Sequence, residues 1–156
     1  MGKRLTDEQK REKYDTVAEC IIDNHQLYHD KPRHRQTMIN GFRNILFDSP
    51  RTFSGFVSEK GQHLKANKLV KEHFYPRQAS AYKMFEMLDA GVTKDELINF
   101  IKMVCQVHYV TKDENEDLKT YQKIGSGYNT WEEQYTAAGI KLVPRIPIKP
   151  GRKPKK

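Results

Sequence analysis

Apolar residues recur at helical spacing through the first fifty residues of the chain. Thr6 followed three residues later by Gln9 is typical of a capping box, and the apolar positions behind it predict a helix that runs to about residue 28. Pro32 can open a second helix, whose apolar stripe continues until Ser49 and Pro50 end it. Two such helices, joined by a short turn, are expected to pack as a hairpin.

Beyond the second helix the pattern favours short strands. The stretch from Thr52 carries aromatic and β-branched residues around a glycine, and residues 59–62 are typical of a turn. A second strand is predicted from Leu69, and it ends by Pro76 because proline cannot donate to a β-ladder. Residues 107–110 predict a further strand.

Two helices are predicted between the second and third strands. Residues 78–89 form the first and Gly91 stops it, while Thr93 with Glu96 makes a capping box for the second. The helical stretch 78–104 is therefore an insertion between two strands that we expect to pair.

A further helix is predicted directly after the third strand. Thr111 and Glu114 are spaced as a capping box, so we interpret Glu114 chiefly as a helix cap and place Asn115 in the first turn or two of that helix. Thr130 caps a shorter helix further along. The order of elements predicts an α+β fold, with an N-terminal helical hairpin and a strand-strand-helix (ββα) core that carries a helical insertion between its strands.

Length and composition fit one domain with a modest core and a charged surface. The chain has 156 residues, of which 37% are hydrophobic and 31% are charged. We expect a single domain over residues 1–143, with the hairpin in residues 1–50 and the ββα core in residues 51–143. Residues 144–156 contain too few apolar side chains to fold alone and are expected to form a basic flexible tail.

The formal charge of +8 favours a nucleic acid as the partner. Lysines and arginines that neutralise phosphates give salt-dependent affinity that is largely independent of base sequence. The expected contacts lie in the middle of the chain and in the tail, at Lys60, Lys65, Lys68, Lys71, Arg145, Lys149, Arg152, Lys153, Lys155 and Lys156.

Cysteine usage and hydropathy indicate an intracellular protein. Cys20 and Cys105 lie far apart in the chain, with no second pair that would make a zinc site or a disulfide framework. No apolar run approaches the roughly 18 residues that cross a bilayer. We therefore expect a reduced, cytoplasmic protein without membrane association.

Four residues in two stretches carry candidate chemistry for cutting a phosphodiester. Glu72 and His73 stand at the end of the second strand, and Asn115 lies on the helix after the third. A carboxylate and an amide oxygen suit Mg²⁺ or Mn²⁺, while a neutral imidazole can take a proton from water. Arg77, four residues after the histidine, can pair with a phosphate through two hydrogen bonds.

The two stretches, residues 71–77 and 106–115, resemble those of phage-type HNH nucleases and free-standing homing endonucleases. The resemblance spans about residues 67–143, and the family has a ββα-metal core. It implies that Glu72 is a metal-ligating carboxylate, that His73 is the general base and that Asn115 is the second metal ligand. An asparagine in that last position is more similar to the endonuclease seven branch than to the standard pattern, which ends in a histidine.

The activity that the resemblance implies is metal-dependent hydrolysis of double-stranded DNA, with site-specific, homing-type cleavage as one form of it. The divalent cation would be Mg²⁺, with Mn²⁺ as the alternative. The setting would be the cytoplasm of a bacterium or of a virus-infected cell. A monomer and a homodimer both stay open, and a homodimer would serve to cut both strands.

Two other functions compete with this interpretation. A non-catalytic DNA- or RNA-binding accessory protein would need only the helical hairpin and the basic tail. A PD-(D/E)xK nuclease is a rival from the same chemistry, but Glu59 and Lys60 lack the spacer of its motif, and Asp48 precedes them without a clear strand.

The other histidines are expected to have structural or surface roles. His108 occupies an alternating strand, where a packed histidine is more common than a ligand, although it stays a candidate to complete the site. His63 is expected to contact phosphate or water. His25, His29 and His34 have no carboxylate at ligand spacing, and we interpret them as surface residues.

Overall fold

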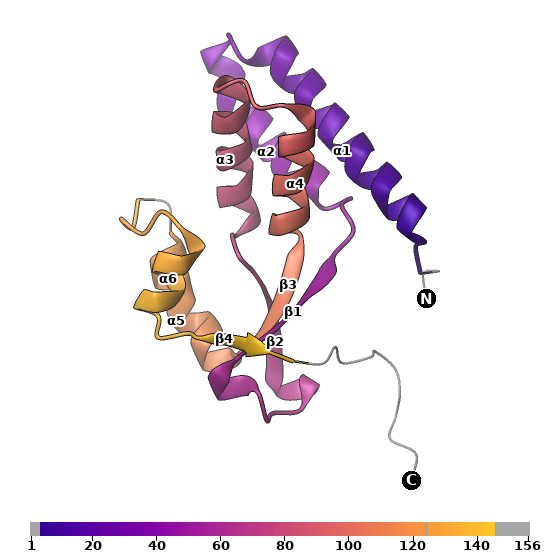
Figure 1. The fold of residues 1–156 in the computed structure, drawn as a ribbon. Helices are drawn as coiled ribbons and strands as arrows, with labels where there is room; N and C mark the ends of the chain where they lie inside the picture. The colour runs from indigo at the N-terminus through magenta and orange to yellow at the C-terminus, as the bar shows by residue number, and fades with distance from the viewer. Residues whose placement is uncertain (1–3, 124, 146–156) are drawn as a thin grey trace. The chain divides into compact units, whose positions relative to one another are not determined.

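The computed structural model describes residues 4–123 and 125–145 and has the predicted α+β class (Figure 1). The chain divides into two compact units, and each unit draws on separate segments of the sequence. The helical unit comprises residues 4–52 and 73–106, and the sheet unit comprises residues 53–72, 107–123 and 125–145. This division differs from the predicted boundary at residue 50, because segments distant in the sequence share one core.

The first and last helices of the helical unit begin at the predicted capping boxes, whereas Pro32 opens a short 3-10 helix ahead of the second helix. Thr6 and Gln9 form the predicted capping box, with Thr6 Oγ1 accepting from the Gln9 amide at 3.1 Å and Gln9 Oε1 accepting from the Thr6 amide at 2.9 Å. Thr93 and Glu96 form a second box. The elements are α1 (Asp7–Tyr28), the short 3-10 helix η1 (Pro32–His34), α2 (Arg35–Leu46), α3 (Arg77–Asp89) and α4 (Lys94–Val104). None of the helices described is both long and apolar enough to cross a membrane.

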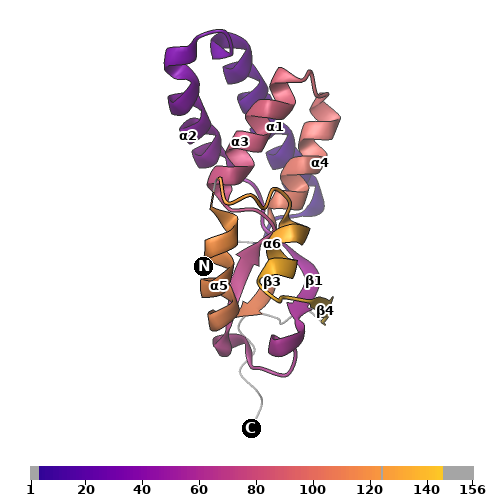
Figure 2. The same ribbon diagram turned by 90° about the vertical axis from the view of Figure 1, so that its left-hand side faces the viewer.

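The four α-helices of this unit lie together (Figure 2), and each contributes buried apolar side chains. Helix α1 packs against α2 and α4, and α2 packs against α3. The two helices of the predicted hairpin therefore do pack against each other. They make half of a four-helix arrangement, which the helices inserted between the second and third strands complete. Its largest fully buried side chains are Ile21, Ile39, Phe42, Met84, Phe85, Leu97 and Ile101.

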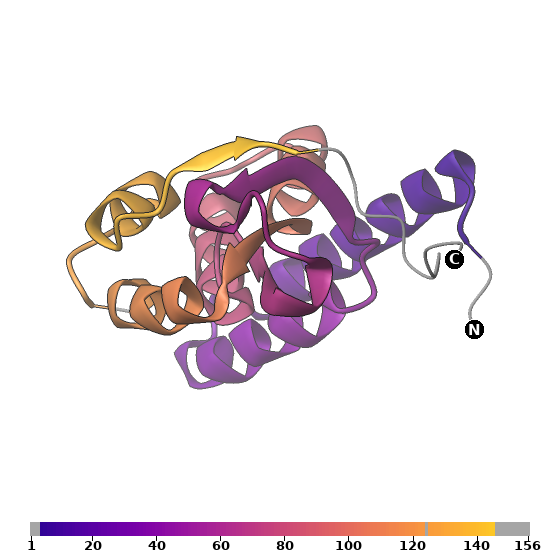
Figure 3. The same ribbon diagram turned by 90° about the horizontal axis from the view of Figure 1, so that it is seen from below.

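The four strands form one sheet in the order β2-β3-β1-β4. Strands β2 and β3 are neighbours, so the expected pairing across the helical insertion is confirmed. Strand β4 runs antiparallel to β1, with Val57 opposite Val143 (Figure 3). The strands are β1 (Thr52–Ser58), β2 (Leu69–His73), β3 (Gln106–Thr111) and β4 (Leu142–Pro144).

Two helices and two 3-10 turns complete the sheet unit. Val110, Leu118, Tyr135 and Ile140 form its buried core, so strand β3 and both helices contribute apolar side chains. Residues 59–62, expected to be a turn, contain a 3-10 helix in which the Ser58 hydroxyl accepts from the Gly61 amide. These elements are η2 (Glu59–Gly61), η3 (Ala66–Lys68), α5 (Lys112–Gln122) and α6 (Trp131–Ala137).

Candidate functional site

The four predicted catalytic and metal-binding residues fall into different units. Glu72 and Asn115 belong to the sheet unit, whereas His73 and Arg77 belong to the helical unit. Glu72 and His73 end β2 as predicted. Successive side chains of a strand point to opposite faces, so Glu72 and His73 do not form a local pair on one face.

His73 is held by the backbone of the helical unit. Its Nδ1 lies 3.0 Å from the carbonyl oxygen of Val104. A carbonyl oxygen can only accept, so Nδ1 is the donor in this contact. Burial lowers the pKa of His73, hydrogen bonds to the backbone of Val104 and Gln106 oppose that effect, and the charges of Arg77 and Arg51 lower the pKa further. The imidazole is therefore neutral at pH 7.

Arg77 lies beside His73 at the start of α3. Its guanidinium carbon is 3.4 Å from the centre of the Phe47 ring, a stacking contact that fixes the plane of the charged group. Burial lowers the pKa of Arg77, and the positive charges of Arg51 and Arg43 lower it further. Arg51 and Arg43 therefore both lie close enough to Arg77 to repel its guanidinium group.

His73, Arg51 and Arg77 line a pocket within the helical unit that is too small for a nucleotide. Its volume is about 10 Å³, which is room for about one water molecule. Any phosphate would therefore contact the rim and not the interior. The pocket is lined by Leu46, Ser49, Arg51, His73, Arg77, Ser80, Val104 and Cys105.

No carboxylate balances this charge among the described residues. We call Arg43, Arg51 and Arg77 the arginine cluster, and none of them takes part in an ion pair of the described chain. Asp48, which is near them in sequence, instead lies 3.4 Å from the ammonium of Lys13. The cluster is a concentration of positive charge suited to an anion.

Reasoning from the sequence identified Arg77 but missed Arg43 and Arg51. Arg43 lies on α2, and Arg51 directly precedes β1. Their separation from Arg77 in the chain leaves no local spacing signal. The packing of α2 against α3 brings the helix of Arg43 next to that of Arg77, and Arg51 joins them from the segment between α2 and β1.

In the sheet unit, Glu72 lies on β2 and Asn115 lies on α5. Glu72 Oε1 accepts a hydrogen bond of 3.3 Å from Gln122 Nε2, and Asn115 is half-buried on α5. Within the described ranges no group of three or more His, Cys, Asp or Glu side chains could hold a metal ion. A site made of one carboxylate and one amide, as the resemblance implies, stays a prediction.

Glu114 is buried, and its carboxylate does not complete the predicted capping box. The Thr111 hydroxyl does accept from the Glu114 amide at 3.2 Å, so half of the box is present. The carboxylate instead accepts from the Ser58 hydroxyl at 2.8 Å and is only 3% exposed. The prediction that Glu114 is chiefly a cap is therefore wrong, because its side chain joins α5 to the end of β1.

The lysines predicted to contact nucleic acid form an exposed segment of the sheet unit. Lys60, Lys65, Lys68 and Lys71 are all exposed, and none joins an ion pair in the described part of the chain. We call these four residues the lysine segment. It lies along η2, η3 and β2.

Arg145 has a structural role that the sequence did not suggest. Its guanidinium donates to the carbonyl oxygens of Gly61 at 3.3 Å and Leu64 at 2.9 Å, which anchors the loop after β1. The other predicted tail contacts lie outside the described residues, and they are Lys149, Arg152, Lys153, Lys155 and Lys156.

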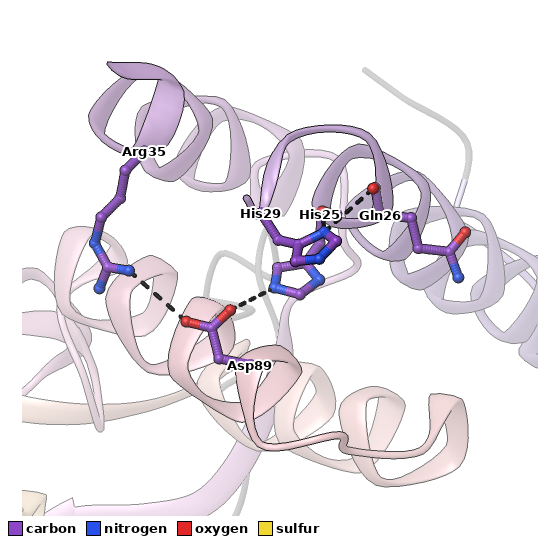
Figure 4. Close-up of polar contacts among 5 residues, drawn as sticks. All are labelled: His25, Gln26, His29, Arg35 and Asp89. Atoms are coloured by element: carbon purple, nitrogen blue, oxygen red, sulfur yellow. Dashed lines mark hydrogen bonds and ion pairs between the residues drawn. The ribbon is translucent and has the colours of Figure 1, made fainter. Parts of the chain in front are cut away.

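Two histidines are buried, and one of them corrects a prediction. His108 is fully buried, with its Nε2 hydrogen-bonded to the Tyr135 hydroxyl, which agrees with the packed role expected for it. His25 is only 8% exposed and its Nε2 lies 2.8 Å from Asp89 Oδ1 (Figure 4). The interpretation of His25 as a surface residue is wrong, because α3 packs over it. His29 and His34 are exposed as expected.

Comparison with models of protein families, with curated proteins and with solved structures gives no significant match. The functional argument therefore depends on the chemistry of the two units.

Proposed function

We propose that the chain binds DNA through the phosphate backbone and that the arginine cluster makes the principal contact. The observation that carries this proposal is that Arg51 and Arg77 line one pocket of the helical unit, with Arg43 near enough to lower the pKa of Arg77, while none of the three joins an ion pair among the described residues. Like charges at such a site destabilise the folded chain, and a bound phosphate removes that repulsion. The lysine segment adds sequence-independent affinity.

The chemistry of guanidinium favours phosphate over other anions. Its planar fork donates two parallel hydrogen bonds to a pair of phosphate oxygens, and it is more weakly hydrated than an ammonium group. Phe47 stacks on Arg77 and restricts its rotation, so less conformational entropy is lost on binding.

Salt-dependent binding tests this proposal. The affinity for a 20-base-pair duplex would be measured by fluorescence anisotropy across a range of salt concentrations. Arg51→Gln/Arg77→Gln is expected to weaken binding at least tenfold and to reduce the slope of log K against log salt by about 1.8, since each phosphate contact contributes about 0.9.

Arg4→Gln/Arg11→Gln is the matched control, because it removes the same charge from exposed positions outside the cluster. The control is expected to keep most of the slope. Equal losses in the two double variants would show that net charge, and not the arginine cluster, binds the duplex.

A second function, hydrolysis of the phosphodiester, is favoured by His73. Its ring is oriented by Val104, its pKa is lowered, and it lines the same pocket as Arg51 and Arg77. A neutral imidazole beside a phosphate held by guanidinium groups can take the proton of an attacking water. In this reaction the helical unit would supply the base and the phosphate-binding groups.

Cleavage of supercoiled plasmid with Mg²⁺ present tests the second function. Wild type is expected to nick the plasmid, and His73→Ala is expected to lose cleavage while it still binds DNA. If both proteins bind and neither cuts, hydrolysis is refuted and binding stands. If His73→Ala cuts as well as wild type, the base is another residue.

A further inference from the structure

Gly41 stands in the interior of α2 without a packing reason for a glycine. A Cβ added there would meet no atom within 4 Å. Glycine in a helix interior destabilises the helix relative to alanine, and close approach of a neighbouring element normally explains it. Here the missing side chain instead leaves open a groove of about 310 Å³ between α1 and α2.

The groove has an apolar floor and an aromatic rim. Met38 and Phe42 are buried, and Ile45 is half-buried beside them. Tyr28 and His34 stand at the rim, where their ring centres are 5.4 Å apart and the rings are tilted by 45°. Both residues are exposed. This volume is at the lower end of the range for small-molecule sites, so it suits one planar ring system.

Two cations lie in the turn beside this rim, next to the exposed carboxylate of Asp30. Lys31 and Arg33 lie in the turn that joins α1 to α2, and the Lys31 ammonium is 5.3 Å from the centre of the Tyr28 ring. Arg35 is drawn away, because it lies 3.7 Å from Asp89 (Figure 4). Lys31 and Arg33 join no ion pair in the described chain, so they can meet an anion next to the groove.

We infer that this groove takes an unpaired nucleobase, with the adjoining phosphate on Lys31 and Arg33. The inference rests on the proposed binding of DNA and names a second mode of contact, with single-stranded or unpaired segments. Aromatic faces stack with any base, and a cation beside them neutralises the backbone. Asn24 and Thr37 also line the groove and offer polar groups to the edge of the base.

Two single-stranded oligonucleotides with the same phosphates distinguish contacts with the bases from contacts with the backbone. One is a normal 12-nucleotide strand and the other is abasic at every position. Wild type is expected to bind the normal strand about 5- to 150-fold more tightly, which corresponds to about 1–3 kcal/mol from stacking of one base. Gly41→Leu fills the groove and is expected to reduce this preference to less than about twofold, while affinities for the abasic strand and for a duplex stay unchanged.

Asn44→Leu is the matched control, because it adds the same side chain to an exposed position of α2 outside the groove. It is expected to keep the preference. If Gly41→Leu does not fold, Tyr28→Ala at the exposed rim replaces it, with the same expected loss.

The outcomes separate this inference from the proposed function. Equal binding of both strands by wild type, or an undiminished preference in a folded groove variant, overturns the nucleobase site. Salt-dependent duplex binding would still stand in either case. A wild type that binds neither strand nor the duplex refutes the proposed function and the inference together.

Discussion

His25 Nε2 lies 2.8 Å from Asp89 Oδ1, and this contact joins the C-terminal part of α1 to the last residue of α3 (Figure 4). The His25 ring also stacks on His29 at 5.2 Å and meets the edge of Phe85 at 5.3 Å. Arg35 approaches the other oxygen of Asp89 at 3.7 Å. One carboxylate thus connects three helices of the helical unit.

Loss of the His25 side chain should destabilise the helical unit. His25→Ala removes a hydrogen bond to a carboxylate and leaves a cavity beside Phe85, so we expect a loss of about 1–3 kcal/mol. His29→Ala, at an exposed neighbour, should cost less than about 0.5 kcal/mol. Urea unfolding followed by circular dichroism measures both. Equal losses would show that the contact with Asp89 contributes nothing specific.

The lowered pKa of His73 predicts a loss of stability in acid. Its unfolded value is the ordinary 6.5, and the folded value is lower, so the unfolded state binds the proton more readily. The stabilising contribution is present above pH 6.5 and is lost as the pH falls below it. The free energy of unfolding should differ less between pH 8 and pH 5 for His73→Asn than for wild type. Identical pH dependence in the two proteins would contradict this assignment.

The two thiols should differ in reactivity in the native protein. Cys20 is exposed, whereas Cys105 is buried and burial raises the pKa of its thiol. A disulfide reagent should modify one thiol quickly and the second only after denaturant is added. Cys20→Ser should abolish the fast reaction. Two fast reactions in native buffer would mean that the pocket beside Arg77 opens readily.

Gly61 should not tolerate a larger side chain. An alanine Cβ would lie 2.8 Å from Leu69 Cδ2 and 3.0 Å from the Ser58 hydroxyl, so we expect Gly61→Ala to cost about 1–3 kcal/mol. Gly41→Ala is the contrast, since its Cβ meets open space, and it should stabilise α2 by up to about 1 kcal/mol. Thermal unfolding of both variants measures the two changes in stability. Similar melting temperatures would contradict the predicted clash.

The Ser58 hydroxyl should be needed by the buried Glu114 carboxylate. Ser58→Ala leaves that carboxylate without its 2.8 Å donor, and we expect a loss of about 2–3 kcal/mol. Adding Glu114→Gln should recover part of the loss, because a neutral amide costs less to bury than a charge. A double-mutant cycle measures the coupling. No coupling between the two sites would show that Glu114 is stabilised by other groups.

Local signals predicted the secondary structure well. Capping boxes at Thr6, Thr93 and Thr130 are present in the structure, and the strand that ends in Glu72 and His73 lies where alternation placed it. These features depend on residues three or four positions apart, or on period-two alternation, which the sequence displays directly. The same signals failed at Glu114, where a distant serine competes for the carboxylate.

The sequence by itself placed most of the helices and strands to within a few residues, and it determined the net positive charge. Only the tertiary structure decided that the inserted helices complete the N-terminal hairpin, that His25 is buried, and that Arg43 and Arg51 lie near Arg77. The physical reason is the separation along the chain over which each interaction acts. Capping and alternation act between near neighbours, whereas burial and charge repulsion depend on which distant segments pack together.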